Sequence, residues 1–392
     1  MKLVVIGLGQ GGSRVADEFA QLNSRAKSER KIEITPGVFA VNTDAADLSG
    51  LRYIGTSYQS RILIGSRQAG GHGVGKINEM GAEIAKADGD KVIDAIRTAK
   101  RFYESDAFMI IASSGGGTGS GALPVITQMV KDRYGDKPIY AMVILPFEHE
   151  ESAEERTTYN TATCLKSIGQ LADAVFLVDN QRYVRKDYSL RNNLSKINVL
   201  IAEPFYDLLC AGEEKKIKSI GSKVVDAGDI RQTLTGWTVI GHGKADIATF
   251  KIPFLQTRNF RKKSSETHKG LQAMDEALSE LSLQCNPMDA GRAIYMLAAP
   301  HKEMNLEIVK ELGDYLRDLA PNAVIRNGDY PRERSSVGVT LILSQLSDVE
   351  KVRNYYYKSA DLVPKYQSRQ KEIETQLKQM DEAGDDIPSL LD

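Results

Sequence analysis

A run of glycines at residues 115–121, GGGTGSG, constrains this chain more than any other feature, because it puts five glycines into seven residues directly after an apolar segment. Glycine loses more backbone entropy on folding than any other residue type, and a tight strand-to-helix turn needs only one or two of them. Bare backbone at such a turn lets N–H groups point at a bound anion, and the N-terminus of the following helix adds partial positive charge. The sequence therefore predicts a phosphate-binding loop.

Apolar and helical segments alternate along the first half of the chain. Helices are expected between strands at residues 1–6, 37–44, 61–66, 107–114, 138–147 and 173–180. This alternation is typical of an α/β fold with a parallel sheet covered on both faces. Ligands of such sheets bind beyond the C-terminal ends of the strands, which is where the glycine-rich and small polar segments of this chain fall.

From about residue 193 onward, the pattern of expected helices and strands differs from that of the first half. A long helical segment is expected at 193–211, with a kink or a break at Pro204. The strands and helices that follow indicate a second, smaller α/β domain. Near the end, a tyrosine-rich helix is expected to stop at Pro364, and the basic run RNFRKKSS at 258–265 is expected to be a loop.

Composition and charge argue against several functional classes. The chain is 42% apolar and 26% charged with a net charge of −1, so it has no overall basic field for nucleic acid or an anionic membrane. Cys164, Cys210 and Cys285 lie far apart, which gives neither a zinc spacing nor a disulfide framework. The four-residue apolar run before Gly7 is too short for a signal peptide, and no segment approaches a membrane span. We expect a cytoplasmic protein with no nucleic-acid partner and no direct membrane insertion.

Two other glycine-rich motifs match known fingerprints incompletely. GLGQGG at 7–12 fits the dinucleotide pattern and favours a NAD-dependent oxidoreductase, but Asp44 ends the second strand 32 residues after Gly12 rather than about twenty. GGHGVGKI at 70–77 nearly forms a P-loop, but Ile77 replaces the hydroxyl residue that would bind magnesium. Neither fingerprint explains GGGTGSG. Several such loops at one sheet edge suit a polyphosphate chain.

The set of motifs, in this order, resembles the tubulin/FtsZ superfamily. GGGTGSG matches its phosphate-loop signature, and the similarity extends over about residues 1–346. The other matching segments are GLGQGGSRV for the first nucleotide loop, AVNTDAAD (40–47) for the second, GGHGVG for the third, LVDN (177–180) for the guanine segment, VVDAGDI (224–230) for the catalytic loop, and AGRAIYMLAAP through SVGVTLILSQL for the C-terminal activation domain. GLGQGG together with GVGKINEMGAE is most similar to the archaeal CetZ group, FtsZ-like proteins linked to cell shape.

The resemblance implies a Rossmann-like parallel-sheet GTP-binding domain, a long central helix and a smaller α/β C-terminal domain. The expected parts are a nucleotide-binding domain at 1–192, a central helix and catalytic loop at 193–227, an activation domain at 228–346, and C-terminal helices with a tail at 347–392.

The resemblance also implies a ligand and the residues that hold it. The ligand is GTP or GDP, with Mg²⁺ held through the phosphates and no metal ligand from the protein. By similarity the α- and β-phosphates face Gly9, Gln10, Gly11 and Gly12; the γ-phosphate and its metal are bordered by Asp44, Ala45, Gly71 and Gly73; and the donors of the main phosphate loop are Gly115, Gly116, Gly117, Thr118 and Gly119, with Ser120 beside them.

The same similarity places the nucleoside. Asn180 and Asn198 fall where the family contacts the guanine edge, and an amide can both donate and accept there. Leu194 stands where an aromatic residue usually stacks on the base. The ribose contact remains open among Glu151, Glu155 and Arg156.

Asp226 and Asp229 have two interpretations. Their spacing at the start of a helix fits ordinary N-terminal capping. The resemblance implies instead that they are catalytic acids that complete the nucleotide site of the next subunit, so that head-to-tail contact builds a filament and activates GTP hydrolysis. Because Val224 replaces the usual Asn of this loop, a filament or scaffold protein that binds GTP structurally and hydrolyses little is the alternative.

The expected partner is the chain itself, in a head-to-tail protofilament with lateral sheets and a membrane adaptor or regulator as further candidates. The basic run at 258–265 is a candidate lateral contact. A tail helix at 365–382 carries a narrow apolar stripe of Ile373, Leu377 and Met380 that could dock on the core or on a neighbour. The sequence leaves open whether the cell uses such filaments for shape or for division.

Overall fold

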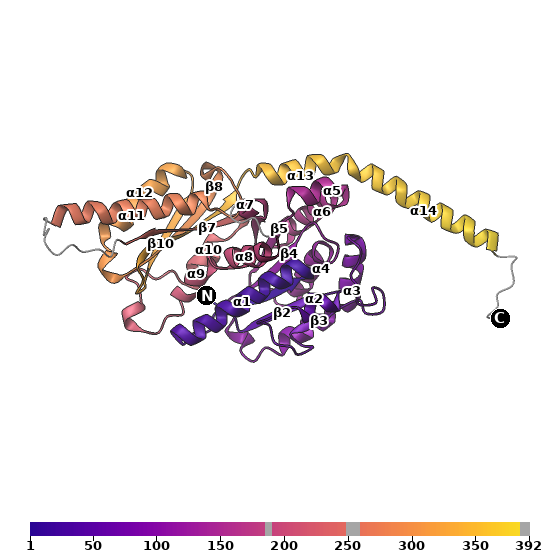
Figure 1. The fold of residues 1–392 in the computed structure, drawn as a ribbon, viewed down its shortest axis with the longest axis horizontal. Coiled ribbons are helices and arrows are strands. Elements are labelled where there is room, and N and C mark those ends of the chain that lie inside the picture. Colours follow the sequence, from indigo (N-terminus) through magenta and orange to yellow (C-terminus); the bar gives the residue numbers. More distant parts are fainter. Residues whose placement is uncertain (185–189, 248–258, 385–392) are drawn as a thin grey trace.

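The computed structural model describes residues 1–184, 190–247 and 259–384 of the chain. In these residues ten strands form one sheet, in the order β3-β2-β1-β4-β5-β6-β7-β10-β8-β9 (Figure 1). The strands are β1 (Leu3–Leu8), β2 (Gly37–Asn42), β3 (Arg61–Leu63), β4 (Ala107–Ser113), β5 (Ile139–Leu145), β6 (Ala174–Asp179), β7 (Gly236–Asp246), β8 (Ala290–Ala299), β9 (Val324–Pro331) and β10 (Ser336–Leu346).

Strand β7 joins the two halves of this sheet. Strands β1 to β6 are all parallel, and β6 continues parallel to the first residues of β7, Gly236 to Thr238. The rest of β7 pairs antiparallel with β10, which pairs antiparallel with β8. The predicted α/β class with a mainly parallel central sheet is confirmed. The boundaries proposed from the sequence at 192, 227 and 346 stay predictions.

Helices cover the sheet and extend beyond it. The helices are α1 (Gly9–Arg30), α2 (Ala45–Ser49), α3 (Asn78–Arg97), α4 (Thr118–Arg133), α5 (Glu148–Ala153), α6 (Glu155–Leu171), α7 (Gln181–Val184), α8 (Leu190–Ala202), α9 (Phe205–Ala211), α10 (Ala227–Thr233), α11 (Asn259–Ser279), α12 (Leu306–Leu319), α13 (Glu350–Ala360) and α14 (Leu362–Gly384), with single 3₁₀ turns η1 (Phe102–Glu104), η2 (Ile217–Ser219), η3 (Pro287–Asp289) and η4 (His301–Glu303).

The core lies on both faces of the sheet. Alternate residues of β1 point to opposite sides: Val4 and Ile6 pack with side chains of α3, α4 and α6, whereas Val5 packs with those of α1 and α9. Because both sides of each central strand are buried, these strands read as continuous apolar runs in the sequence. The glycine-rich segments between them are thereby held at one edge of the sheet.

One open alternative is decided and two local expectations change. Pro204 breaks the long helical segment rather than kinking it, so that α8 and α9 are separate helices. Residues 259–265 of the basic run form the first part of α11 instead of a loop, and Arg258 lies outside the described residues. The tyrosine-rich helix α13 ends at Ala360, and Pro364 sits in the first turn of α14, where its missing N–H has no helical partner to lose.

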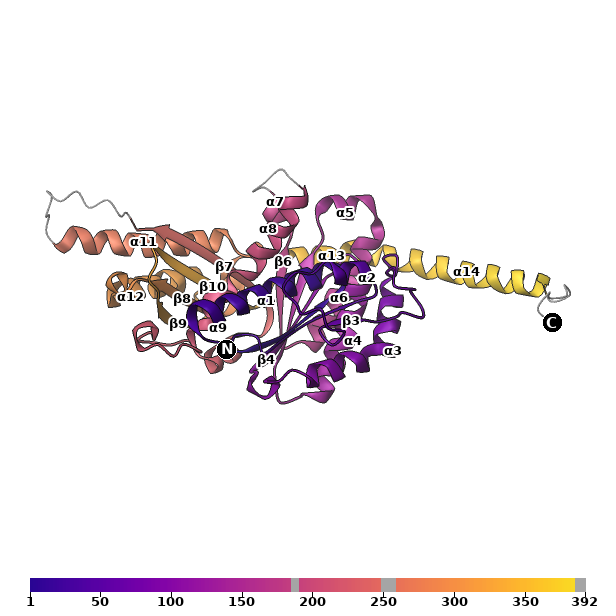
Figure 2. The same ribbon diagram turned by 60° about the horizontal axis from the view of Figure 1, so that its bottom comes forward.

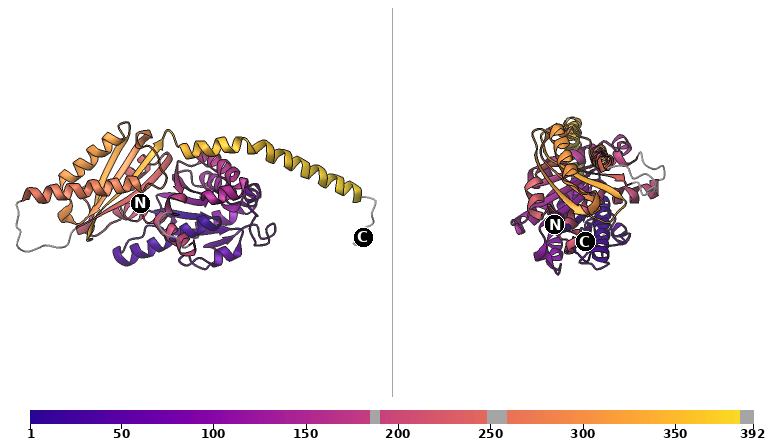
Figure 3. Two further views of the ribbon diagram at one scale, coloured as in Figure 1. Left: turned by 45° about the horizontal axis from the view of Figure 1, so that its top comes forward. Right: turned by 90° about the vertical axis from the view of Figure 1, so that its left-hand side faces the viewer.

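The last helix, α14, runs away from the body of the molecule (Figure 3). Met380 of the predicted stripe is 67% exposed, and the side chains of Ile373 and Leu377 lie outside the described residues. Among the described residues, no helix combines the length and the apolar character needed to cross a membrane.

Candidate functional site

A cleft with a volume of about 370 Å³ opens where β1, β4, β5 and β6 end. This size is typical of small-molecule sites. Helices α5 and α8 rise on this side of the molecule (Figure 2), and both contribute to the wall. The sequence-predicted residues that line it are Gly9, Gln10, Gly11, Asp44, Gly73, Gly115, Gly116, Gly117, Thr118, Gly119, Asn180, Leu194 and Asn198. Four separate glycine-rich or polar segments therefore converge on one cleft.

Four further predicted residues, Gly12, Ala45, Gly71 and Ser120, do not line the cleft. Gly12 packs against β4, since a Cβ there would meet the Ile111 carbonyl oxygen at 2.2 Å. Ala45 donates its N–H to Gly71 O at 3.1 Å, which ties the second loop to the third. Ser120 donates its hydroxyl to Gly116 O and so supports the phosphate loop from inside α4.

The three ribose candidates point away from the cleft. Glu151 accepts a hydrogen bond from Tyr355, Glu155 pairs with Lys365, and Arg156 pairs with Glu79. Glu150 lines the cleft in their place, and its Oε2 also accepts from Phe147 N at 3.0 Å. Glu150 and Glu151 are neighbours on the short helix α5. Because adjacent residues of a helix face different directions, the phase of α5 decides which of the two faces the cleft, and sequence spacing does not reveal it.

The phosphate loop needs its glycines mainly because backbones approach each other closely. A Cβ at Gly121 would lie 2.0 Å from Asn78 O on α3, and one at Gly117 would lie 2.8 Å from Ile77 N. At Gly116, in contrast, a Cβ would have no heavy atom of the described residues within 4 Å. The four predicted glycines of this loop, Gly115, Gly116, Gly117 and Gly119, all line the cleft, and Gly116 is the one of them whose Cβ would face open space there.

Two helix N-termini point into the cleft without side-chain caps. Helices α1 and α4 begin at Gly9 and Thr118, which both line it. Among the described residues, no side chain caps either helix, and neither first turn carries an acidic residue. Gly9 takes φ +68°, a conformation that favours glycine, as the chain turns directly from β1 into α1. The unpaired N–H groups and the two helix dipoles make this end of the cleft attractive to anions.

Two cationic residues that the sequence analysis did not select also line the cleft. Arg14 lies in the second turn of α1. Lys76 adopts φ 61°, and its Nζ lies 2.7 Å from Glu154 Oε2 and 3.4 Å from Thr157 Oγ1. Lys76 is the lysine of GGHGVGKI. The P-loop pattern would have selected it, but this segment does not match that pattern because Ile77 replaces the hydroxyl residue.

A buried asparagine holds two of the loops together. Asn160 on α6 is fully buried, and its Nδ2 donates to Lys76 O at 2.9 Å and to Gly115 O and Gly116 O at 3.2 Å each. Thr43 and Thr118 share a further bond, with their hydroxyl oxygens 2.6 Å apart. Drawing the carbonyl oxygens toward the protein interior leaves the opposite side of the backbone free for a ligand.

Acidic residues flank the cleft near α2. Asp44 caps α2, with its Oδ1 accepting from Ala46 N at 2.8 Å and Asp47 N at 3.0 Å. Asp47 lines the cleft and accepts from Gln10 Nε2 at 2.7 Å. The described residues contain no group of three His, Cys, Asp or Glu side chains that could hold a metal ion. A cation here would depend on oxygen ligands from a bound phosphate.

The other end of the cleft combines apolar groups and amides. Leu194, Ile197 and Asn198 come from α8, Asn180 follows β6, and Phe147 follows β5. Such a mixture suits a flat, partly apolar ligand group with polar edges.

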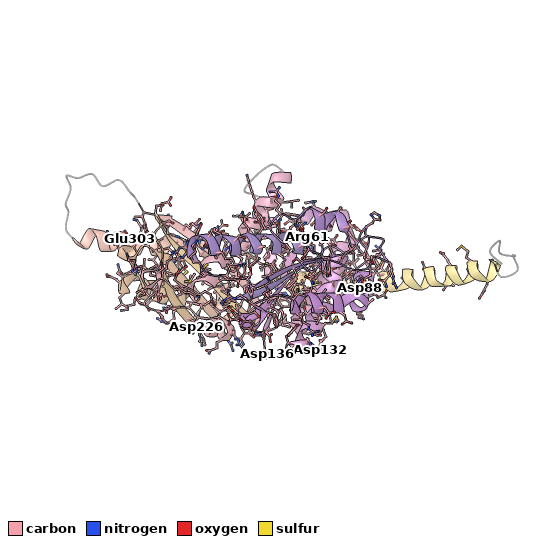
Figure 4. The ribbon with its side chains drawn as sticks, turned by 90° about the horizontal axis from the view of Figure 1, so that it is seen from below. Arg61, Asp88, Asp132, Asp136, Asp226 and Glu303 are labelled. Carbon is pink, nitrogen blue, oxygen red and sulfur yellow. The ribbon has the colours of Figure 1, made fainter. Side chains whose placement is uncertain are left out.

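Asp226 and Asp229 do not line the cleft and lie at the opposite end of the sheet. Helix α10 leads into Gly236, whose N–H donates to Asp173 O at 2.9 Å beside the start of β6, whereas Asn180 follows the end of β6. The six residues of β6 span roughly 20 Å. Figure 4 labels Asp226 in the half of the molecule that holds the C-terminal strands, apart from Arg61 of β3.

Both acids have local partners. Asp226 is the N-cap of α10 and accepts from Asp229 N at 2.9 Å, as the capping interpretation expects. Asp229 Oδ1 lies 3.3 Å from Arg326 Nε, and its side chain is 40% exposed. Each acid therefore remains accessible at the surface.

Comparisons with known proteins agree on one family. The family model "Tubulin/FtsZ family, GTPase domain" matches residues 2–186, and "Tubulin-like CetZ, C-terminal domain" matches residues 187–361. The chain is 31% identical to the tubulin-like protein CetZ3 of Haloferax volcanii over 364 residues, which cover 90% of each chain.

Solved structures give the same result. The GDP-bound monomer of CetZ1 from Haloferax volcanii superposes with a TM-score of 0.78 at 29% identity, covering 92% of this chain and 99% of that one. A GTPγS-bound protofilament of CetZ2 from the same organism gives a TM-score of 0.78 at 27% identity, covering 94% and 100%.

Proposed function

The chain belongs to the tubulin/FtsZ family as a CetZ-like member, and we propose that it binds GTP and GDP in the cleft, assembles head-to-tail into filaments and hydrolyses GTP where two subunits meet. We further propose that these filaments act in the cytoplasm on the shape or division of an archaeal cell, through a membrane adaptor or regulator.

One observation is the main support for a di- or triphosphate as the ligand. Two long helices direct uncapped N-termini into the same cleft, and Arg14 and Lys76 add two cations beside them. A single phosphate would satisfy one such terminus, whereas a di- or triphosphate can reach both. Mg²⁺ bound through the phosphates would supply further charge neutralisation, with Asp44 and Asp47 placed to bind its water ligands.

The amide end of the cleft suits guanine. Asn180 and Asn198 each offer a donor and an acceptor, which matches the carbonyl and ring N–H of that base. Leu194 supplies an apolar surface without the stacking of an aromatic ring, so discrimination between bases depends mainly on the amides. Glu150 is our candidate for the ribose contact, in place of Glu151, Glu155 or Arg156.

The placement of the acids supports head-to-tail assembly. The cleft and the pair Asp226 and Asp229 lie at opposite ends of one subunit, so stacking copies in one direction brings the acids of one to the cleft of the next. There the carboxylates would orient the water that attacks the γ-phosphate, because phosphoryl transfer depends mainly on positioning and charge.

A structural GTP-binding scaffold with little hydrolysis is the alternative. The observation that favours it is that Asp226 caps its own helix while Asp229 contacts Arg326. Val224 in place of the usual Asn of this loop also favours it.

GTP turnover per molecule is expected to rise above a threshold protein concentration when it is measured with magnesium. The reason is that each site would be complete only between two subunits. Phosphate release, followed across a dilution series with light scattering in parallel, measures this. Turnover that is constant per molecule would refute the shared site, and GTP binding without turnover would establish the scaffold.

Asn160→Ala is expected to weaken GTP binding about tenfold, because the loop carbonyls at residues 76, 115 and 116 lose their common donor. The measurement is a fluorescent-nucleotide titration. Asn23→Ala is the matched control, since Asn23 is also buried and bonds Thr35 O at 2.9 Å outside the cleft. Equal losses of nucleotide affinity in both variants would show that Asn160 acts on stability alone.

A further inference from the structure

Helix α13 packs on the outer side of the cleft wall that α5, α6 and the end of β6 form. Figures 1 and 2 place α13 beside α6 and close to α5. Three residues that contact α13 or the start of α14 each stand directly before or after a cleft-lining residue. Glu151 follows Glu150, Arg156 precedes Thr157, and Asp179 precedes Asn180.

The contact at β6 is an ion pair. Lys351 Nζ lies 2.7 Å from Asp179 Oδ2, and the two side chains are only 28% and 12% exposed. The other oxygen of Asp179 accepts from Gln181 N at 3.0 Å. The carboxylate therefore fixes the backbone on both sides of Asn180 while Lys351 neutralises it.

The contact at α5 is a buried hydrogen bond. Tyr355 is 2% exposed, and its hydroxyl donates to Glu151 Oε1. Burial and the neighbouring carboxylate both raise the pKa of Tyr355, so it stays a donor at any physiological pH. Lys358 Nζ lies 3.6 Å from the other oxygen of Glu151. One face of α5 is thus attached to α13 while Glu150 faces the cleft.

The contact at α6 is a stack around one arginine. The Arg156 guanidinium lies 5.1 Å from the ring centre of Tyr366 on α14, and the Tyr159 and Tyr366 rings are 5.0 Å apart. Lys365 also pairs with Glu155. The next residue along α6, Thr157, lines the cleft.

We propose that α13 and the first turns of α14 form an outer support for the nucleotide cleft, with Lys351 and Tyr355 as positioning residues, so that nucleotide binding and the docking of α13 stabilise each other. This proposal rests on the proposed function and adds regulation to it. Binding linkage is reciprocal, so anything that pulls on the projecting α14 and loosens α13 also lowers nucleotide affinity.

The test measures affinity for GDP and ADP in separate titrations of the full chain. Lys351→Met leaves a part-buried carboxylate without its cation, and GDP affinity is expected to fall about tenfold. Tyr355→Phe removes one hydrogen bond to Glu151, and a fall of about threefold is expected. Lys351→Arg should restore binding. Arg353→Met is the control, because Arg353 pairs with exposed Asp348 beside its own helix.

Base discrimination separates positioning from general stability. If α13 positions Asn180, the preference for GDP over ADP narrows in Lys351→Met. Simple destabilisation instead lowers the affinities for GDP and ADP equally, and that result would overturn the proposal. In the wild-type protein, GDP is expected to slow hydrogen exchange in residues 350–366, and unchanged exchange there would also overturn it. A wild-type protein that binds no GDP would instead refute the proposed function.

Discussion

Asp226→Asn is expected to lower GTP turnover about a hundredfold or more while nucleotide binding and assembly persist. Asparagine is as good an N-cap as aspartate, so α10 keeps the bond from Asp229 N that Asp226 now accepts at 2.9 Å. The substitution removes only the carboxylate charge that would orient water against the γ-phosphate. Phosphate release at a protein concentration well above the assembly threshold measures the effect.

The control for this prediction is another exposed acid that also pairs locally. Asp314 Oδ1 on α12 lies 2.6 Å from Arg317 Nη1, and the Asp314 side chain is 52% exposed. Asp314→Asn is expected to leave GTP turnover unchanged. If Asp226→Asn retains near wild-type turnover, Asp226 is only a helix cap, and the scaffold alternative gains support. Pelleting assays with GTPγS show whether the variant still assembles.

Mixing subunits tests whether the acids act in trans. A variant with a damaged cleft retains Asp226 and Asp229, and Asp226→Asn retains its cleft. In a random one-to-one filament, about a quarter of the junctions pair an intact cleft with an intact Asp226 and Asp229. Turnover of the mixture above that of either variant alone supports the shared site. No gain in co-assembled filaments would place catalysis within one subunit.

The layers of the fold could be read from the sequence because their signals are local. Apolar strands such as 107–113 and amphipathic helices alternate, and that pattern requires a parallel sheet with ligand loops at one edge. The gathering of Gly9, Asp44, Gly116 and Asn180 follows from this topology. Boundaries were less accessible, since the strand expected at 1–6 extends to Leu8 and α1 starts within the first glycine motif.

Side-chain direction was not readable from the sequence. Whether Glu150 or Glu151 faces the cleft depends on how α5 docks against α13, a contact between residues some two hundred positions apart. Asn160 is an ordinary helix residue in the sequence, and only the three-dimensional approach of α6 to two loops gives it three acceptors. Contacts of this kind arise from tertiary packing and leave no periodic signal.

Two glycines of the phosphate loop are expected to respond in opposite ways to the same substitution. In Gly116→Val the new side chain meets no described heavy atom within 4 Å of its Cβ, so the free energy of unfolding should hardly change. The side chain would instead occupy space that a phosphate needs. Losing two charge-assisted hydrogen bonds of about 1.5 kcal/mol each corresponds to about a hundredfold weaker nucleotide binding.

In Gly121→Val the Cβ would lie 2.0 Å from Asn78 O and 2.7 Å from Ala82 N, both in the backbone of α3. Relieving that overlap must push α3 and α4 apart, at a cost of about 3 kcal/mol or more. Denaturant unfolding without nucleotide and a GDP titration of whatever protein remains folded measure the two effects separately. If Gly116→Val destabilises the fold as much as Gly121→Val, or if it binds GDP like the wild type, then Gly116 does not face the phosphates. The loop would then owe its glycines to packing alone, and the case for a polyphosphate in this cleft would rest on the two uncapped helix N-termini, Arg14 and Lys76.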